Sequence, residues 1–125
     1  MTLYLTLDEV LHIHSALIAA FGGASGVRDL GLIESALLRP QTGYYADLIE
    51  EAAALWESLA QNHPFIDGNK RTAFAATYTF LAINGAQVTA DAEETYIFIW
   101  GLYEAGMFNF DKLAQWLRHN AKLRV

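Results

Sequence analysis

The stretch that decides the fold is NKRTAFAATYTFLAIN, residues 69–84. After Arg71 nearly every side chain in it is apolar, which is typical of a helix that runs through the centre of a domain. Asn69 is expected to cap the start of this helix, and the pair Asn84–Gly85 supplies a left-handed stop at its end. The sequence therefore predicts a buried central helix, around which the other elements pack.

Helical signals continue on both sides of this segment. Two capping boxes, Thr6 with Glu9 and Asp91 with Glu94, mark helix starts, because each side chain can bond the backbone N–H of the other residue. Five further helices are predicted: one from the Thr6 box to Gly22, a short one around Leu32–Leu37 that Pro40 ends, one from about Asp47 to Gln61, one from Asp91 to about Ala105, and one capped by Asn109. The prediction is an all-α fold, a single compact bundle of about six helices, with residues 1–125 as one domain.

Composition excludes several classes of protein. With 125 residues, 54% of them hydrophobic, the chain can bury a core and is too apolar to be disordered. The lack of Cys excludes disulfides, thiolate metal sites and a Cys nucleophile, and it fits a reducing cytoplasm. The 14 Asp and Glu residues against eight Lys and Arg give a net charge of −6, so we expect no direct binding of nucleic acid.

A membrane location is not expected either. No uncharged run reaches the roughly 18 apolar residues that a spanning helix needs. Residues 1–10 have no basic region and carry Asp8 and Glu9, so we do not expect a signal peptide. The sequence therefore predicts a cytoplasmic protein.

One segment, HPFIDGNKRT at residues 63–72, concentrates reactive side chains at the start of the central helix. A helix N-terminus offers unpaired N–H groups and the positive end of the dipole, which favour an anion. Lys70 and Arg71 oppose that dipole and cost stability unless an anion arrives, a conflict typical of functional sites. We predict that Gly68, Asn69, Lys70 and Arg71 form a phosphate-binding cradle.

Two more residues of this segment are suited to phosphate chemistry. Asp67 could hold Mg²⁺, which binds through one or two carboxylates together with substrate phosphate oxygens. His63 could take a proton from an attacking hydroxyl, because a neutral imidazole is present near pH 7. His-Pro and Asp-Gly-Asn are each ordinary loop sequences when alone, but their combination with two cations is difficult to obtain by chance.

This segment resembles a known family. Residues 63–71 match the Fic/Doc signature His-x-Phe-x-(Asp/Glu)-Gly-Asn-(Gly/Lys)-Arg, and Lys70 at its eighth position is similar to the death-on-curing (Doc) branch. Residues 23–40 and 80–85 also resemble that branch, so the similarity covers most of the chain. It implies a Fic/Doc-like helical bundle. Phe65, an apolar residue between reactive neighbours, is expected to anchor the loop in the core.

The resemblance implies a toxin that transfers the γ-phosphate of ATP, with Mg²⁺, to a Thr or Ser hydroxyl of a translation elongation factor of the Tu class. The catalytic residues would be His63, Asp67, Lys70 and Arg71, with Asp67 as the metal ligand. Fic members with Gly at the eighth position transfer AMP and usually carry a second Arg where Phe74 stands here. Lys70 and Phe74 therefore disfavour AMP transfer, which stays as the alternative, and a catalytically silent antitoxin-binding module is the second alternative.

The resemblance also implies an antitoxin whose flexible C-terminal segment folds as a helix in a surface groove. The apolar residues Leu17, Ile18 and Phe21 are predicted to supply that groove.

Outside the motif, His12 and His14 should face different sides of one helix and cannot share a metal, so solvated or core-edge roles are expected. The three Trp residues are predicted to lie in the core. For Tyr44 and Tyr45, packing and a target-presenting flap both stay open.

Overall fold

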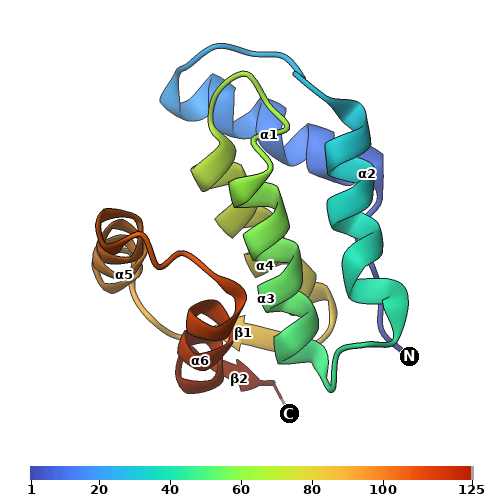
Figure 1. Ribbon diagram of the computed structural model, residues 1–125, viewed down its shortest axis with the longest axis vertical. Coiled ribbons are helices and arrows are strands. Elements are labelled where there is room, and N and C mark those ends of the chain that lie inside the picture. Colours follow the sequence, from blue (N-terminus) through green and yellow to red (C-terminus); the bar gives the residue numbers. More distant parts are fainter. Residues whose placement is uncertain (125) are drawn as a thin grey trace.

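The predicted central helix, α4 (Asn69–Ile83), lies beside α3 (Leu48–Gln61) in the middle of the molecule (Figure 1). The computed structural model describes residues 1–124. Its other elements are α1 (Leu7–Phe21), α2 (Leu30–Leu38), a 3-10 helix η1 (Arg39–Thr42), β1 (Ala86–Val88), α5 (Ala92–Ala105), α6 (Phe110–Asn120) and β2 (Ala121–Leu123). Within these residues no helix is both long enough and apolar enough to cross a membrane.

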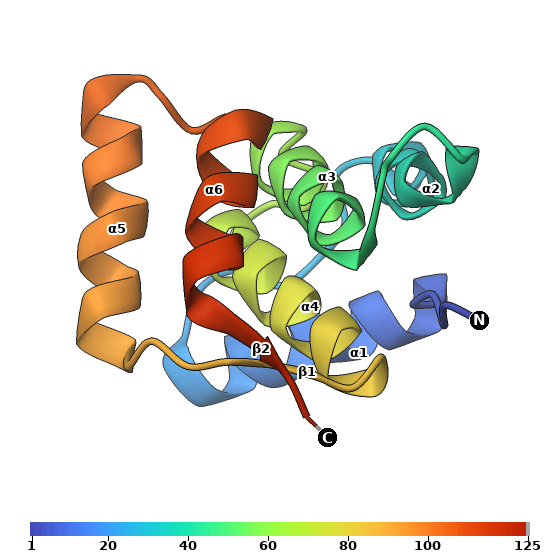
Figure 2. The ribbon, with the colours of Figure 1, turned by 90° about the horizontal axis from the view of Figure 1, so that it is seen from below.

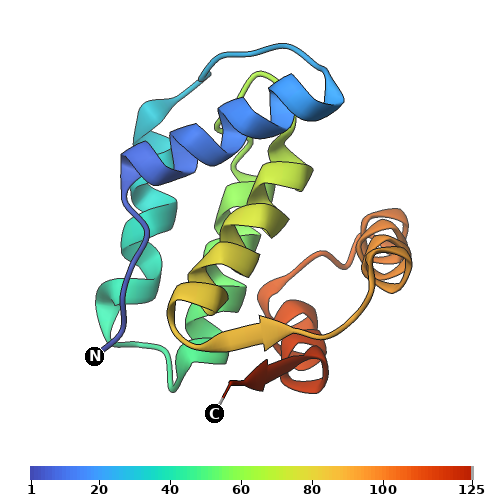
Figure 3. The same cartoon turned by 180° about the vertical axis from the view of Figure 1, so that it is seen from behind.

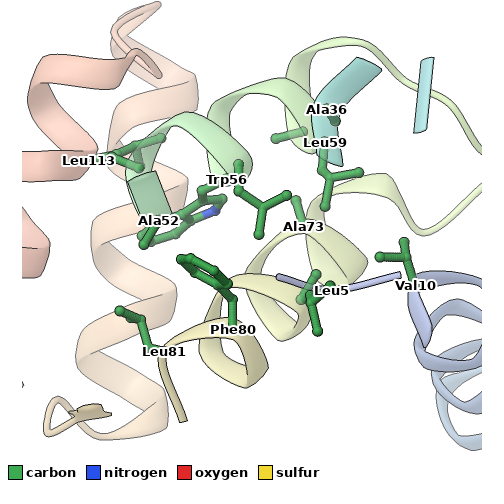
Figure 4. Packing of buried hydrophobic residues seen from close by; sticks show 14 of the residues in the cluster. Leu5, Val10, Ala36, Ala52, Trp56, Leu59, Ala73, Phe80, Leu81 and Leu113 are labelled. Atoms are coloured by element: carbon green, nitrogen blue, oxygen red, sulfur yellow. The ribbon is translucent and has the colours of Figure 1, made fainter. Parts of the chain in front are cut away.

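Small residues let the two central helices approach closely. Ala52 and Ala53 of α3 and Ala73 and Ala76 of α4 are fully buried. Larger side chains fill the space around these contacts, and Figure 4 shows Trp56 and Phe80 between the two helices. Because both helices bury apolar side chains along their length, they provide the rigid base on which the motif loop stands.

The remaining helices cover this pair. α1 crosses the first half of α4 (Figure 3), and α6 packs against α3. α5 is the outermost helix on its side of the bundle (Figure 2), and Thr95 is its only buried residue. The predicted capping boxes of α1 and α5 both form, and Asn109 caps α6 as predicted. The helix predicted from about Asp47 begins at Leu48, with Asp47 as its N-cap.

The all-α prediction is confirmed, with one small addition. β1 pairs with β2 in an antiparallel sheet of two strands, in which Gln87 lies opposite Lys122. A strand of three residues carries too little alternation to be recognised from sequence, so β2 was not predicted. Pro40 ends α2 as predicted, although the chain continues for one turn as η1.

The prediction that all three Trp residues belong to the core is wrong for one of them. Trp56 is fully buried and Trp116 packs partly buried against the core, whereas Trp100 is 50% exposed. The reason is that α5 contacts the bundle through one face only. The side of α5 that carries Trp100 borders an open cleft instead.

Candidate active site

Two segments far apart in the sequence pair to form the loop that precedes α4. Val27 forms an antiparallel bridge with Phe65, and the N–H of Ile66 donates to the carbonyl of Gly26 at 3.1 Å. The N–H groups of Arg28 and Asp29 both donate to the carbonyl of Pro64, at 2.8 and 3.0 Å. The glycine-rich loop after α1 is therefore a backbone support for the motif.

A buried histidine of α1 holds the middle of the motif. Phe65 is 2% exposed, and its ring stacks on the ring of His14 with 3.8 Å between centroids. Nε2 of His14 also lies 2.8 Å from the carbonyl oxygen of Asp67. Phe65 thus anchors the loop in the core as expected. His12 is exposed, but the role of His14 beneath the site was missed, although its position four residues after Val10 places it on the apolar stripe.

Asn69 is not the N-cap of α4, contrary to the prediction. Gly68 occupies the cap position with φ +76°, and no side chain caps the helix start. The Asn69 side chain instead accepts from the N–H of Phe65 at 2.9 Å and donates to the carbonyl of Phe65 at 3.0 Å. The amide therefore closes the loop on itself, which leaves the start of α4 without a capping side chain and open to an anion.

The Asp67 carboxylate is held in its ionised form. The pKa of Asp67 is lowered, first by the hydrogen bond that Oδ2 accepts from the N–H of Ala24 at 3.1 Å and then by the bond from the N–H of Gly68 to Oδ1. The positive charge of Arg71 adds to this effect. An ionised, exposed carboxylate fits Mg²⁺ that arrives with a nucleotide, because this ion commonly uses few protein ligands. Across residues 1–124 no cluster of three or more His, Cys, Asp or Glu forms a separate metal cage.

The two cations of the motif lie against aromatic rings of two different helices. Nζ of Lys70 is 4.3 Å from the centroid of the Tyr103 ring on α5, and Cζ of Arg71 is 4.5 Å from that of Phe21. Neither cation forms a salt bridge with a residue that the structure describes. Burial raises the pKa of Tyr103 to about 12, so its phenol stays neutral beside Lys70.

All the predicted site residues line one cleft of about 1090 Å³. They are His63, Asp67, Gly68, Asn69, Lys70 and Arg71. Apolar and aromatic side chains form the rest of the wall, mainly Phe74, Tyr78, Tyr96, Ile99, Trp100 and Tyr103 of α4 and α5. A volume of this size, with polar groups gathered at one end, suits a nucleotide-sized ligand.

Comparison with known proteins agrees with this geometry. The Fic/DOC family model matches residues 4–81, which span α1 to α4 and the motif loop, so the chain belongs to the Fic/DOC family. It is 51% identical over 96 residues to Toxin Doc of Mycolicibacterium smegmatis, across 73% of this chain and 72% of that protein. It is 35% identical over 89 residues to Protein kinase doc of Escherichia phage P1, across 68% and 71% of the two chains.

These relatives place the chain in the death-on-curing branch of the family. The similarity supports a Fic-type transferase and a Doc-type toxin. The roles assigned to the individual site residues stay predictions.

Proposed function

We propose that this chain is a Doc-type toxin that transfers the γ-phosphate of ATP to a Ser or Thr hydroxyl of a protein. The observation that carries the proposal is the gathering of His63, Asp67, Lys70 and Arg71 at an uncapped helix start, all facing one cleft. Phosphoryl transfer needs little covalent work from the protein, but it needs an oriented nucleophile and compensation of the phosphate charge. A base, a metal-binding carboxylate and two cations supply those parts.

In the proposed reaction, the His63 imidazole accepts the proton of the target hydroxyl as the hydroxyl oxygen bonds to the γ-phosphorus. The bond from that phosphorus to the bridging oxygen breaks, and ADP leaves. The N–H groups at the start of α4, together with Lys70 and Arg71, stabilise the charge on the phosphate oxygens. Asp67 is the residue that would hold Mg²⁺, which when bound neutralises phosphate charge.

Two positions favour γ-phosphate transfer over the alternative, AMP transfer. Lys70 stands where AMP-transferring Fic proteins have Gly, and Phe74 stands where they carry a second Arg. Phe74 lies in the cleft wall with its ring 5.3 Å from that of Trp56, so the wall is apolar where that Arg would contact phosphate. The second alternative, a silent antitoxin-binding module, finds no support in the motif, since every reactive residue of the signature is present.

The proposal also includes two protein partners, the target and the antitoxin. The target is a translation elongation factor of the Tu class in the cytoplasm, and its modification arrests protein synthesis. The antitoxin inserts its C-terminal segment as a helix into the cleft, rather than along the α1 surface alone as the sequence indicated. Leu17 and Ile18 are half-buried, whereas Phe21 and Tyr96 are each 65% exposed and both line the cleft. Residues 1–125 act as one Fic/Doc domain.

The experiment uses the purified protein, a purified Tu-class elongation factor, Mg²⁺ and ATP labelled at either the γ- or the α-phosphate. Label transfer from the γ-position only is the expected result, and it should be absent from the His63→Ala variant. Transfer of the α-label would establish AMP transfer instead. Absence of both labels from the factor and from whole bacterial extract, with retained binding of an antitoxin peptide, would establish the silent module.

A further inference from the structure

His63, the predicted base, has an unusual backbone conformation. Its φ is +49°, and it is the only residue other than glycine with a positive φ among residues 1–124. A side chain in this region costs energy and persists only where the surroundings hold it. His63 directly follows Asn62, the C-cap of α3, so the chain makes this strained turn as it leaves the helix.

The Arg28 side chain grips this turn from the glycine-rich loop. Its Nε donates to the carbonyl of His63 at 2.9 Å, and its Nη2 donates to the same oxygen and, at 3.1 Å, to the carbonyl of Asn62. The backbone N–H of Arg28 donates to the carbonyl of Pro64 at 2.8 Å. One residue therefore binds three successive carbonyls, and the middle one belongs to His63.

The positive charge of Arg28 also stabilises the turn at His63. The last carbonyls of α3 form the negative end of the helix dipole, which a cation stabilises. No carboxylate among the described residues pairs with Arg28, so its guanidinium is directed at the backbone alone. A planar guanidinium donates in a fixed fork that reaches two carbonyls at once, whereas a lysine ammonium is a single point of charge.

We infer that Arg28 is a positioning residue for His63. The His63 side chain is exposed and forms no hydrogen bond with a described residue, so its orientation depends on the backbone that Arg28 fixes. The expected effect on catalysis rests on the proposed phosphoryl transfer, in which His63 is the base. The hydrogen bonds from Arg28 to the backbone of residues 62–64 do not depend on that proposal.

The test compares Arg28→Gln, Arg28→Lys and a matched control, Arg124→Gln. Arg124 is also an exposed arginine that donates to a helix-end carbonyl, from Nη2 to Ala82 at 2.8 Å, but at the far end of α4. We expect Arg28→Gln to lower kcat by up to about 100-fold, since misplacing a reacting group by about 1 Å has that effect. KM for ATP should change less than about twofold, because the cradle is untouched, and Arg124→Gln should keep the wild-type kcat.

Backbone NMR shifts of His63 provide a readout that does not need activity. They should move in Arg28→Gln and partly return in Arg28→Lys, which keeps the charge without the fork. Unchanged shifts, an unchanged kcat, or an equal loss of kcat in Arg124→Gln would each overturn the inference. If Arg28→Gln does not fold, Arg28→Lys decides by the same criteria. If wild-type protein transfers no phosphate, the proposed function fails, while the shifts still decide whether Arg28 holds His63.

Discussion

Replacing Gly23 by Ala should damage the site more than the fold. Gly23 has φ +113°, a conformation that side chains rarely adopt, and such strain costs about 1–3 kcal/mol. A Cβ there would lie 2.7 Å from Oδ2 of Asp67 and 3.2 Å from Cδ1 of Ile18. The carboxylate is the end of a short side chain, so it can rotate away. In doing so it loses the hydrogen bond from the N–H of Ala24.

Gly22→Ala is the matched control. Gly22 has φ +85°, but a Cβ there would meet nothing within 4 Å, so this variant carries backbone strain without the clash. Both variants should therefore lose about 1–3 kcal/mol of stability. Only Gly23→Ala should lose Mg²⁺-dependent transfer, by about 10- to 100-fold, as is typical when a hydrogen-bond partner of a metal-binding carboxylate is removed. Chemical denaturation and the γ-label assay measure the two effects.

The Gly23→Ala variant should also change the titration of the Asp67 carboxylate. The hydrogen bond from Ala24 is the main cause of the lowered pKa of Asp67, so in Gly23→Ala this pKa should rise toward its ordinary value. A carboxylate with a lowered pKa stabilises the fold above its unfolded value of about 3.9 and loses that contribution as pH falls through the folded value. Gly23→Ala should therefore lose stability less steeply than wild type below about pH 4. NMR titration of the Asp67 carboxyl carbon measures the pKa directly.

The opposite result is a Gly23→Ala variant that is as stable as Gly22→Ala in chemical denaturation yet keeps the wild-type rate of transfer and the wild-type pKa of Asp67. That result would mean that the contact between Ala24 and Asp67 is not needed to present the carboxylate.

Three further predictions concern single positions. His63→Ala should lower transfer by about 10² to 10⁴ while circular dichroism stays unchanged, because the residue lies in a loop; growth arrest by this variant would show that toxicity has another source. Lys70→Gly should lose γ-phosphate transfer, and the double variant with Phe74→Arg should favour AMP transfer more than either single change. A folded Lys70→Gly variant with full γ-phosphate transfer would show that Lys70 does not decide between γ-phosphate and AMP transfer. Phe80→Ala should cost about 3–5 kcal/mol in chemical denaturation, since Phe80 is 1% exposed, and a loss below about 1 kcal/mol would contradict its place in the core.

Much of the fold could be predicted from the sequence, because its signals are local. A capping box involves residues three positions apart, so Thr6 with Glu9 and Asp91 with Glu94 located two helix starts correctly. The central helix was recognisable because nearly every side chain after Arg71 is apolar, although Tyr78 and Ile83 at its surface are partly exposed. The candidate site could also be found from local sequence, since its base, carboxylate and cations all lie within residues 63–71.

The tertiary structure alone decided how that site is held. The N–H of Ala24 that bonds Asp67, the ring of His14 that packs on Phe65 and the guanidinium of Arg28 that bonds His63 come from residues 35 to 51 positions upstream. Such contacts leave no periodic pattern, because they depend on how the chain folds back rather than on neighbouring residues. Asn69 was misassigned for a different reason: its sequence position favoured a helix cap, but its side chain bonds the backbone of Phe65, four residues earlier. The sequence thus determined which groups are present, and packing between distant segments determined where they point.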